Sequence, residues 1–112
     1  MKVNILGSEW EVVRLKQDED PGLKHADGYA DFTTRRIVVI TAEPTDDSVK
    51  DLEAYARKVT RHEIVHAFMF ESGLHANSLV FENGWATNEE MVDWFAFQGA
   101  KIYKAWEDAN AL

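Results

Sequence analysis

The sequence predicts an α+β domain in which about four strands in the N-terminal half form a small antiparallel or mixed β-sheet packed on two long C-terminal helices. Four short apolar segments separated by turn residues occupy the first 41 positions. Two longer segments, over residues 48–73 and 87–106, carry apolar side chains at intervals of three and four. Strands followed by helices are typical of a sheet with helices on one face. A chain of 112 residues has room for one core, so we expect a single domain, residues 1–112.

The first two strands are expected within residues 2–16, on either side of a turn at Gly7-Ser8. Apolar residues recur on both sides of this turn, most densely over residues 10–15. An acidic run over residues 17–22 follows and ends in Pro-Gly, a pair that marks a turn. Its charges cannot be buried, so we expect a loop there.

A second pair of strands is expected as a hairpin over residues 29–32 and 36–41, with Thr33-Thr34 at its tip. Residues 37–40 are all Ile or Val, without the polar alternation of a strand that has one face in water. Such a β-branched run is typical of a strand buried on both faces. We therefore place this strand at the centre of the sheet.

The first long helix is expected to begin near Ser48, because Ser48 and Asp51 form a pattern like a capping box. Gly73 gives this helix a natural end, since glycine readily adopts the left-handed conformation that follows a helix. A loop over residues 75–86 then leads to a second helix that begins at position 87 or 88. Apolar residues at three-to-four spacing continue through the second helix.

The pentapeptide His62-Glu63-Ile64-Val65-His66 lies within the first predicted helix and has the form of a zinc-hydrolase signature. Two histidines four apart share one face of a helix, so both imidazoles can reach one metal ion. The glutamate after the first histidine lies about 100° further round the helix, close enough to contact a water held by that ion. We expect His62 and His66 to bind Zn²⁺ and Glu63 to act as the general base.

A catalytic zinc typically has three protein ligands and keeps a fourth position open. At the start of the second helix, Glu89 and Asp93 are four apart and share a face. Glu89 can then bind the zinc while Asp93 accepts the spare N–H of a ligating histidine and orients its ring. The other candidates for the third ligand are Glu71, His75 and Glu90.

These two helix motifs resemble those of small gluzincin metallopeptidases, in particular the ImmA/IrrE-type domains and related minimal peptidases encoded by phages. The matching segments are residues 61–67 and residues 89–96. The resemblance implies zinc-dependent hydrolysis of peptide bonds in one or a few protein targets. It also implies that an edge strand of the sheet binds extended substrate, for which we expect residues 29–32.

Composition limits the other possibilities. The formal charge of −8 argues against nucleic acid as a partner, because an acidic surface repels a phosphate backbone. The chain has no cysteine, which excludes thiolate metal sites and thiol catalysis and fits a reducing cytoplasm. No apolar segment is long enough to span a membrane and the chain does not open with a signal peptide, so we expect no membrane association.

Two other functions fit the same motif: a zinc-containing binding or adaptor protein without activity, and a zinc hydrolase that cuts a non-peptide amide. Glu63 favours an enzyme, because a purely structural zinc site has no use for a base. Peptide hydrolysis also needs a hydrogen-bond donor for the oxyanion. The candidates for this donor are His25, Tyr55, His75 and Tyr103. Trp85, in the loop before the second helix, is the aromatic residue that we expect to contact substrate.

Overall fold

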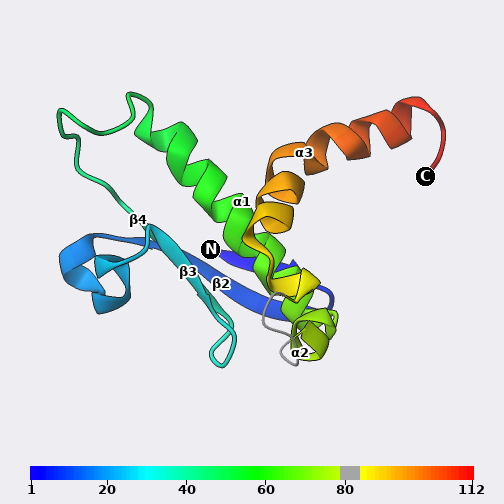
Figure 1. Ribbon diagram of the computed structural model, residues 1–112, viewed down its shortest axis with the longest axis horizontal. Helices are drawn as coiled ribbons and strands as arrows, with labels where there is room; N and C mark the ends of the chain where they lie inside the picture. The colour runs from blue at the N-terminus through cyan, green and yellow to red at the C-terminus, as the bar shows by residue number, and fades with distance from the viewer. Residues whose placement is uncertain (79–83) are drawn as a thin grey trace.

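A mixed β-sheet and two long helices form the architecture, so the predicted α+β class is confirmed (Figure 1). The structure is a computed structural model that describes residues 1–78 and 84–112. The strands are β1 (Lys2–Ile5), β2 (Ser8–Leu15), β3 (Gly28–Asp31) and β4 (Arg36–Ile40). The α-helices are α1 (Leu52–Glu71), α2 (Leu74–Ser78) and α3 (Glu89–Asp108), and the short 3₁₀ helices are η1 (Gln17–Glu19), η2 (Pro21–Lys24) and η3 (Trp85–Thr87).

The sheet has the strand order β1-β2-β4-β3, with β3 at one edge. The outer pairs are antiparallel, whereas β2 and β4 run parallel, so the sheet is mixed. The β1–β2 hairpin turns at Leu6-Gly7, one position before the predicted turn, with φ angles of 50° and 91°. Positive φ at both central residues matches the twist of a tight hairpin. The acidic segment after β2 forms η1 and η2 instead of an irregular loop.

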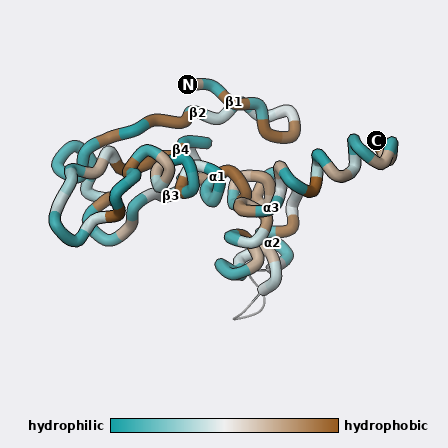
Figure 2. Tube along the Cα trace, turned by 90° about the horizontal axis from the view of Figure 1, so that it is seen from above, coloured by the Kyte–Doolittle hydropathy of each residue, from teal (hydrophilic) through white to brown (hydrophobic). Residues whose placement is uncertain are grey.

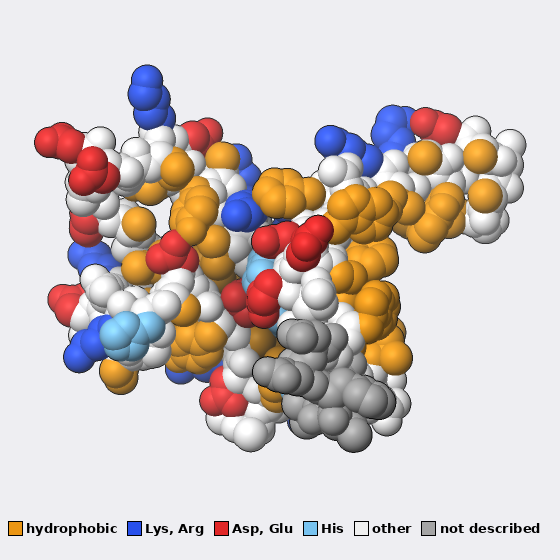
Figure 3. Space-filling model, viewed as in Figure 1, with side chains coloured by type: hydrophobic (Ala, Val, Ile, Leu, Met, Phe, Trp, Pro, Cys, Tyr) orange, Lys and Arg blue, Asp and Glu red, His pale blue; other side chains and the backbone are white. Residues whose placement is uncertain are grey.

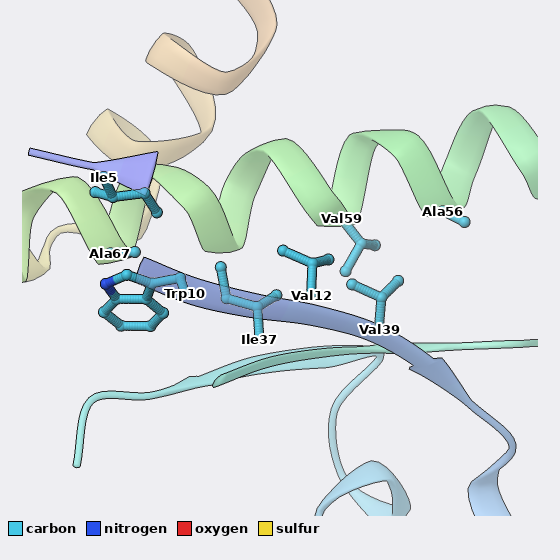
Figure 4. Close-up of a cluster of buried hydrophobic side chains, with 8 residues drawn as sticks. All are labelled: Ile5, Trp10, Val12, Ile37, Val39, Ala56, Val59 and Ala67. Atoms are coloured by element: carbon cyan, nitrogen blue, oxygen red, sulfur yellow. The ribbon is translucent and has the colours of Figure 1, made fainter. Parts of the chain in front are cut away.

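The core lies between the sheet and α1, which crosses one face of it (Figure 4). Trp10 on β2 and Ile37 and Val39 on β4 face the α1 side chains Val59 and Ala67. Val38 alternates with Ile37 and Val39 and therefore points to the opposite face, yet it is also buried. The prediction of a central strand buried on both faces is confirmed.

Both long helices begin on a side-chain cap, and the sequence pattern misplaced only the cap of α1. The start near Ser48 was wrong: α1 begins at Leu52, and Asp51 is its N-cap, accepting a hydrogen bond from the Ala54 N–H at 2.9 Å. The Ser48 hydroxyl is instead part of a turn with Thr45. At α3, Asn88 is the N-cap and accepts from the Met91 N–H at 2.8 Å. A negative or polar cap at the first turn satisfies the free N–H groups there.

The C-terminal end of α1 is anchored to the sheet through Glu71. Its carboxylate accepts hydrogen bonds from Trp10 Nε1 at 2.8 Å, Ser8 Oγ at 3.2 Å and Arg35 Nε at 2.6 Å. The position of Glu71 in the helix, about 140° from His66, predicts a surface side chain, but the side chain is only 9% exposed. Helical geometry places Glu71 away from the histidines, but no sequence pattern predicts that the sheet contacts it there.

The second long helix, α3, packs on α1 only through its first half. Val92 and Ala96 are buried, and Arg61 Nε donates to the Ala96 carbonyl at 3.0 Å. The second half of the helix leaves the body of the protein, as two perpendicular views show (Figures 1 and 2). Within the described residues, neither long helix is apolar enough over its length to cross a bilayer.

Replacing Glu71 with Gln should lower the midpoint of thermal unfolding by several degrees at pH 7. The Arg35 guanidinium, with Trp10 and Ser8, lowers the pKa of Glu71 below its usual range. A carboxyl whose pKa is lowered by folding stabilises the folded state at pH values above its unfolded-state pKa. This stabilisation is lost as the pH falls through its folded-state pKa. The difference between the two proteins should therefore shrink below pH 4. Glu107→Gln, on an exposed part of α3, is the control, and equal effects at both positions would contradict this role of Glu71.

Candidate metal centre

The packing of α1 determines which way the histidine motif points. Val59 and Ala67 are held against the sheet, so the intervening turns present His62 and His66 toward the start of α3. Residues three and four apart lie on one side of a helix, which keeps both rings together. Their centroids are 4.7 Å apart. The structure thus brings the two predicted histidines to the junction of α1, α3 and β3.

Three ligand atoms from two helices converge at this junction. His62 Nε2 lies 3.1 Å from His66 Nε2 and 2.9 Å from Glu89 Oε2, and His66 Nε2 lies 3.2 Å from Glu89 Oε1. A tetrahedral zinc with bonds of about 2.0–2.1 Å places its ligand atoms about 3.3 Å apart. The triangle formed by His62, His66 and Glu89 therefore has the size that a zinc ion needs.

The remaining ring nitrogen of His62 contacts Asp93. Nδ1 of His62 lies 2.6 Å from Asp93 Oδ1, so an Nδ1–H donates to this carboxylate. That tautomer leaves a lone pair on Nε2, which faces the lone pairs of the Glu89 carboxylate. Converging lone pairs repel one another unless a cation or a proton lies between them. The donor set therefore fits Zn²⁺, and Asp93 has the orienting position that the sequence predicted.

Burial favours the neutral, metal-binding form of His66. Removal from water lowers the pKa of His66, while the nearby Glu89 carboxylate opposes this shift. A neutral imidazole has a free lone pair, and a protonated one does not. The site thus holds at least one of its histidines in the state that a metal ligand requires.

Glu63 is the only buried charged residue among those described, with 7% of its surface exposed. Burial raises the pKa of Glu63 to about 7; Glu89 adds to this shift, and His62 opposes it. A carboxylate with a pKa near neutrality can both accept and return a proton. The environment of Glu63 therefore suits a general base beside the three ligand atoms.

Gly28 at the start of β3 lets the edge strand approach Glu63, and sequence analysis missed it. A Cβ added there would lie 2.6 Å from Val59 Cγ1 and 3.5 Å from Glu63 Cγ. Any side chain would push β3 away from α1. A glycine before a predicted strand is a weak signal, because most such glycines belong to turns.

An open cavity of about 430 Å³ is lined by the three ligand residues and by the base. Its walls come from β3, α1, α2 and the start of α3. The lining residues include Gly28, Tyr29, Ala30, Phe32, His62, Glu63, His66, His75 and Glu89. A smaller cavity of about 230 Å³ shares Gly28, His62 and Glu63, so open space continues past the base on both sides. Such a site has room for a substrate next to the metal position.

The structure separates the other third-ligand candidates from the metal triangle. Glu71 bonds to the sheet, and Glu90 lines a different groove beside Trp85. His75 lines the main cavity, but its nitrogens are not among the grouped ligand atoms. It belongs to α2, so the expected loop is helical there, and its ring lies 4.6 Å from the Phe32 ring. Much of the remaining predicted loop, residues 79–83, lies outside the described residues.

Only two of the four oxyanion-donor candidates line a cavity beside Glu63. Tyr103 and His25 are exposed and line neither cavity. Tyr55 lines the smaller cavity, where its hydroxyl donates to Asp27; this bond raises the pKa of Tyr55 to about 12. His75 lines the larger cavity, and its Nδ1 is the one buried side-chain nitrogen or oxygen without a partner among the described residues.

Trp85 does not line the metal cavity. It is exposed and lies with Trp94 and Met91 along a separate groove at the start of α3. The expected contact between Trp85 and a substrate at the metal therefore has no support in the arrangement of the described residues.

In the absence of metal, the raised pKa of Glu63 should make folding stability fall with pH. Below its ordinary value of 4.5 this carboxyl is protonated in both states; between 4.5 and about 7 only the folded state keeps the proton. The free energy of unfolding should therefore decrease across this window, by up to about 3 kcal/mol. Urea unfolding in a chelator would measure it. Glu63→Gln should remove this component, and parallel curves for the two proteins would contradict it.

A comparison of this chain with protein-family models, with curated proteins and with solved structures gives no match.

Proposed function

We propose that this protein is a zinc-dependent peptidase of the gluzincin type that acts in the cytoplasm. The observation that carries the proposal is the triangle of His62, His66 and Glu89 ligand atoms beside the buried Glu63 carboxylate. The Asp93 contact to His62 and the open cavity support it further. The absence of cysteine supports a reducing compartment.

In this mechanism each residue has a separate task. His62, His66 and Glu89 would hold Zn²⁺, which when bound acidifies a water molecule and polarises the substrate carbonyl. Glu63 accepts a proton from the attacking water and returns it to the leaving amine. Asp93 keeps the His62 ring in the orientation that presents Nε2.

An extended peptide fits along β3. This strand pairs with β4 on one side, and its residues Gly28, Tyr29 and Ala30 line the cavity. An edge strand offers unpaired backbone groups to which a peptide can add as a further strand. Such a peptide would pass directly in front of Glu63. We therefore propose β3, which overlaps the segment 29–32 expected from sequence, as the substrate-binding strand.

We assign the oxyanion donor to His75. Its ring is fixed by contact with Phe32 and Phe70 and lines the cavity that holds the metal ligands. Tyr55 already donates its proton to Asp27, so its hydroxyl is less available as a donor. An imidazole N–H can stabilise negative charge that develops on a nearby carbonyl oxygen.

The alternatives differ from this proposal in chemistry rather than in metal binding. An adaptor that retains zinc gains nothing from a buried base beside an open cavity, because burying an unpaired carboxyl opposes folding. A hydrolase of a non-peptide amide would use the same residues, and β3 as an open edge favours a peptide instead.

Zinc content and cleavage of a peptide library together test the function. Glu63→Gln should bind zinc like the wild type while losing nearly all turnover, because it removes the base and keeps the shape. His62→Ala should lose both zinc and activity. A wild-type protein that binds zinc yet cuts no peptide in the library would contradict the peptidase proposal, and one that binds no zinc would contradict the site itself.

Substituting His75 tests the donor assignment. His75→Ala should lower kcat by roughly 100-fold with KM and zinc content nearly unchanged, because the donor acts mainly on the transition state. His75→Asn keeps an N–H donor and should restore part of the rate. His25→Ala, on an exposed loop, is the matched control. Equal loss with Ala and Asn, together with altered zinc binding, would indicate a structural role for His75.

A further inference from the structure

The second half of α3 is an isolated projection. After Ala96 none of the described α3 residues is buried, and Ile102 is the only half-buried residue of the last eight in the helix. The radius of gyration is 15.3 Å, whereas a compact chain of this length has about 13 Å. A helical segment of this length without tertiary support is marginal in water. Contacts beyond those among the described residues would stabilise it.

One side of this projecting helix is apolar. Phe95, Gly99, Ile102 and Trp106 follow one another at intervals of four, three and four residues, which is the seam spacing of a coiled coil. We call these four residues the α3 seam. Phe95 is 38% exposed and Trp106 is 52% exposed. Hydrophobic side chains form an almost continuous ridge along α3 (Figure 3).

No close packing among the described residues requires a glycine at position 99. No described atom outside its own helical turn lies within 4 Å of the position where a Cβ would be added. Glycine in a helix interior is about 1 kcal/mol less favourable than alanine, so the position is costly without an internal reason. A close approach by a second helix would supply that reason, because only glycine leaves the backbone uncovered.

We propose that α3 pairs antiparallel with α3 of a second copy of this chain, through the α3 seam. The seam is complementary to itself when the two-fold axis passes between positions 100 and 101. Phe95 then meets Trp106 of the second copy, and Ile102 fills the space above Gly99 of the second copy. Each of these pairs places a large side chain of one copy in the space that the other copy leaves open, which is the knobs-into-holes packing of coiled coils. This size match is what selects a second copy over an unrelated partner.

Charge also favours this contact. The chain carries a net charge of −8, which opposes association through most of its surface. Residues 95–106 contain two lysines and no acidic residue, so two copies can approach here without bringing carboxylates together. Lys101 and Lys104 lie on the helix face away from the seam and stay in solvent.

The available area indicates a weak dimer. Three partly exposed aromatic side chains (Phe95, Tyr103 and Trp106) offer roughly 100 Å² each, or about 600 Å² over two copies. With the flanking helix surface the total approaches about 1,200 Å², the lower end for specific interfaces. We expect dissociation in the micromolar range. Glu89 and Asp93 lie on the other side of α3, so the metal cavity remains open in the dimer.

Sedimentation velocity of the full chain over a range of concentrations tests the proposal. The wild type should form dimers, and Trp106→Ala should raise the dissociation constant about tenfold or more. Trp94→Ala is the matched control: it removes an equally exposed tryptophan, 54% against 52%, from a different face of the same helix, and should change the constant less than about twofold. Monomers at all concentrations, or a larger effect at Trp94, would overturn the proposal.

Gly99→Leu separates pairing from simple helix stability. Leucine raises helix propensity, so circular dichroism should show equal or greater helicity, while the dimer should weaken because Ile102 of the second copy no longer fits. A tighter dimer would overturn the proposed packing. Glu63→Gln should leave the dimer unchanged, so the outcome is independent of the proposed peptidase function.

Disulfide cross-linking tests the direction of the helices, since the natural chain has no cysteine. A mixture of Met91→Cys and Asn110→Cys chains, with oxidised glutathione as the oxidant, should form mainly the mixed disulfide. Antiparallel pairing brings the first turn of α3 next to the residues that follow α3 in the second copy. Parallel pairing would instead join Asn110→Cys chains to each other, and that result would overturn the proposed arrangement.

Discussion

The seating of α1 across the sheet is the constraint on which the candidate site depends. Val59 and Ala67 must be buried on β2 and β4, and this fixes the rotation of the helix about its axis. His62, Glu63 and His66 then emerge along one flank, between β3 and α3. A change that rotated α1 by one residue, about 100°, would carry both imidazoles away from Glu89. The packing of the core therefore determines the geometry of the site in this fold.

Local sequence patterns predicted most of the fold. The Ile-Val run at 37–40 and the two amphipathic segments depend on side-chain periodicity, and the structure places them as expected. The cap of α1 was misplaced because Ser48 and Asp51 both suit a cap, and only the turn at Thr45 decides between them. The parallel pairing of β2 with β4 joins segments that are distant in sequence, which periodicity alone cannot specify.

The residues of the candidate site were predictable where two of them lie four apart on one helix. The pairs His62–His66 and Glu89–Asp93 are each four apart, and the structure brings both pairs together. Gly28 and the buried position of Glu71 followed no spacing rule, since each depends on a contact between segments far apart in the chain. The orientation of His75 likewise depends on its contacts with Phe32 and Phe70.

The division of the ligand atoms between two helices has a mechanical consequence. α3 is joined to α1 by two buried side chains, Val92 and Ala96, and by the bond from Arg61 to a backbone carbonyl. An ion shared by His62, His66 and Glu89 would act as a cross-link between these helices. Its release would free the first turns of α3 to open locally, so amide protons there would exchange faster in the apo protein than in the loaded one. Amide hydrogen exchange in α3 would then report whether the metal site is occupied, without any substrate.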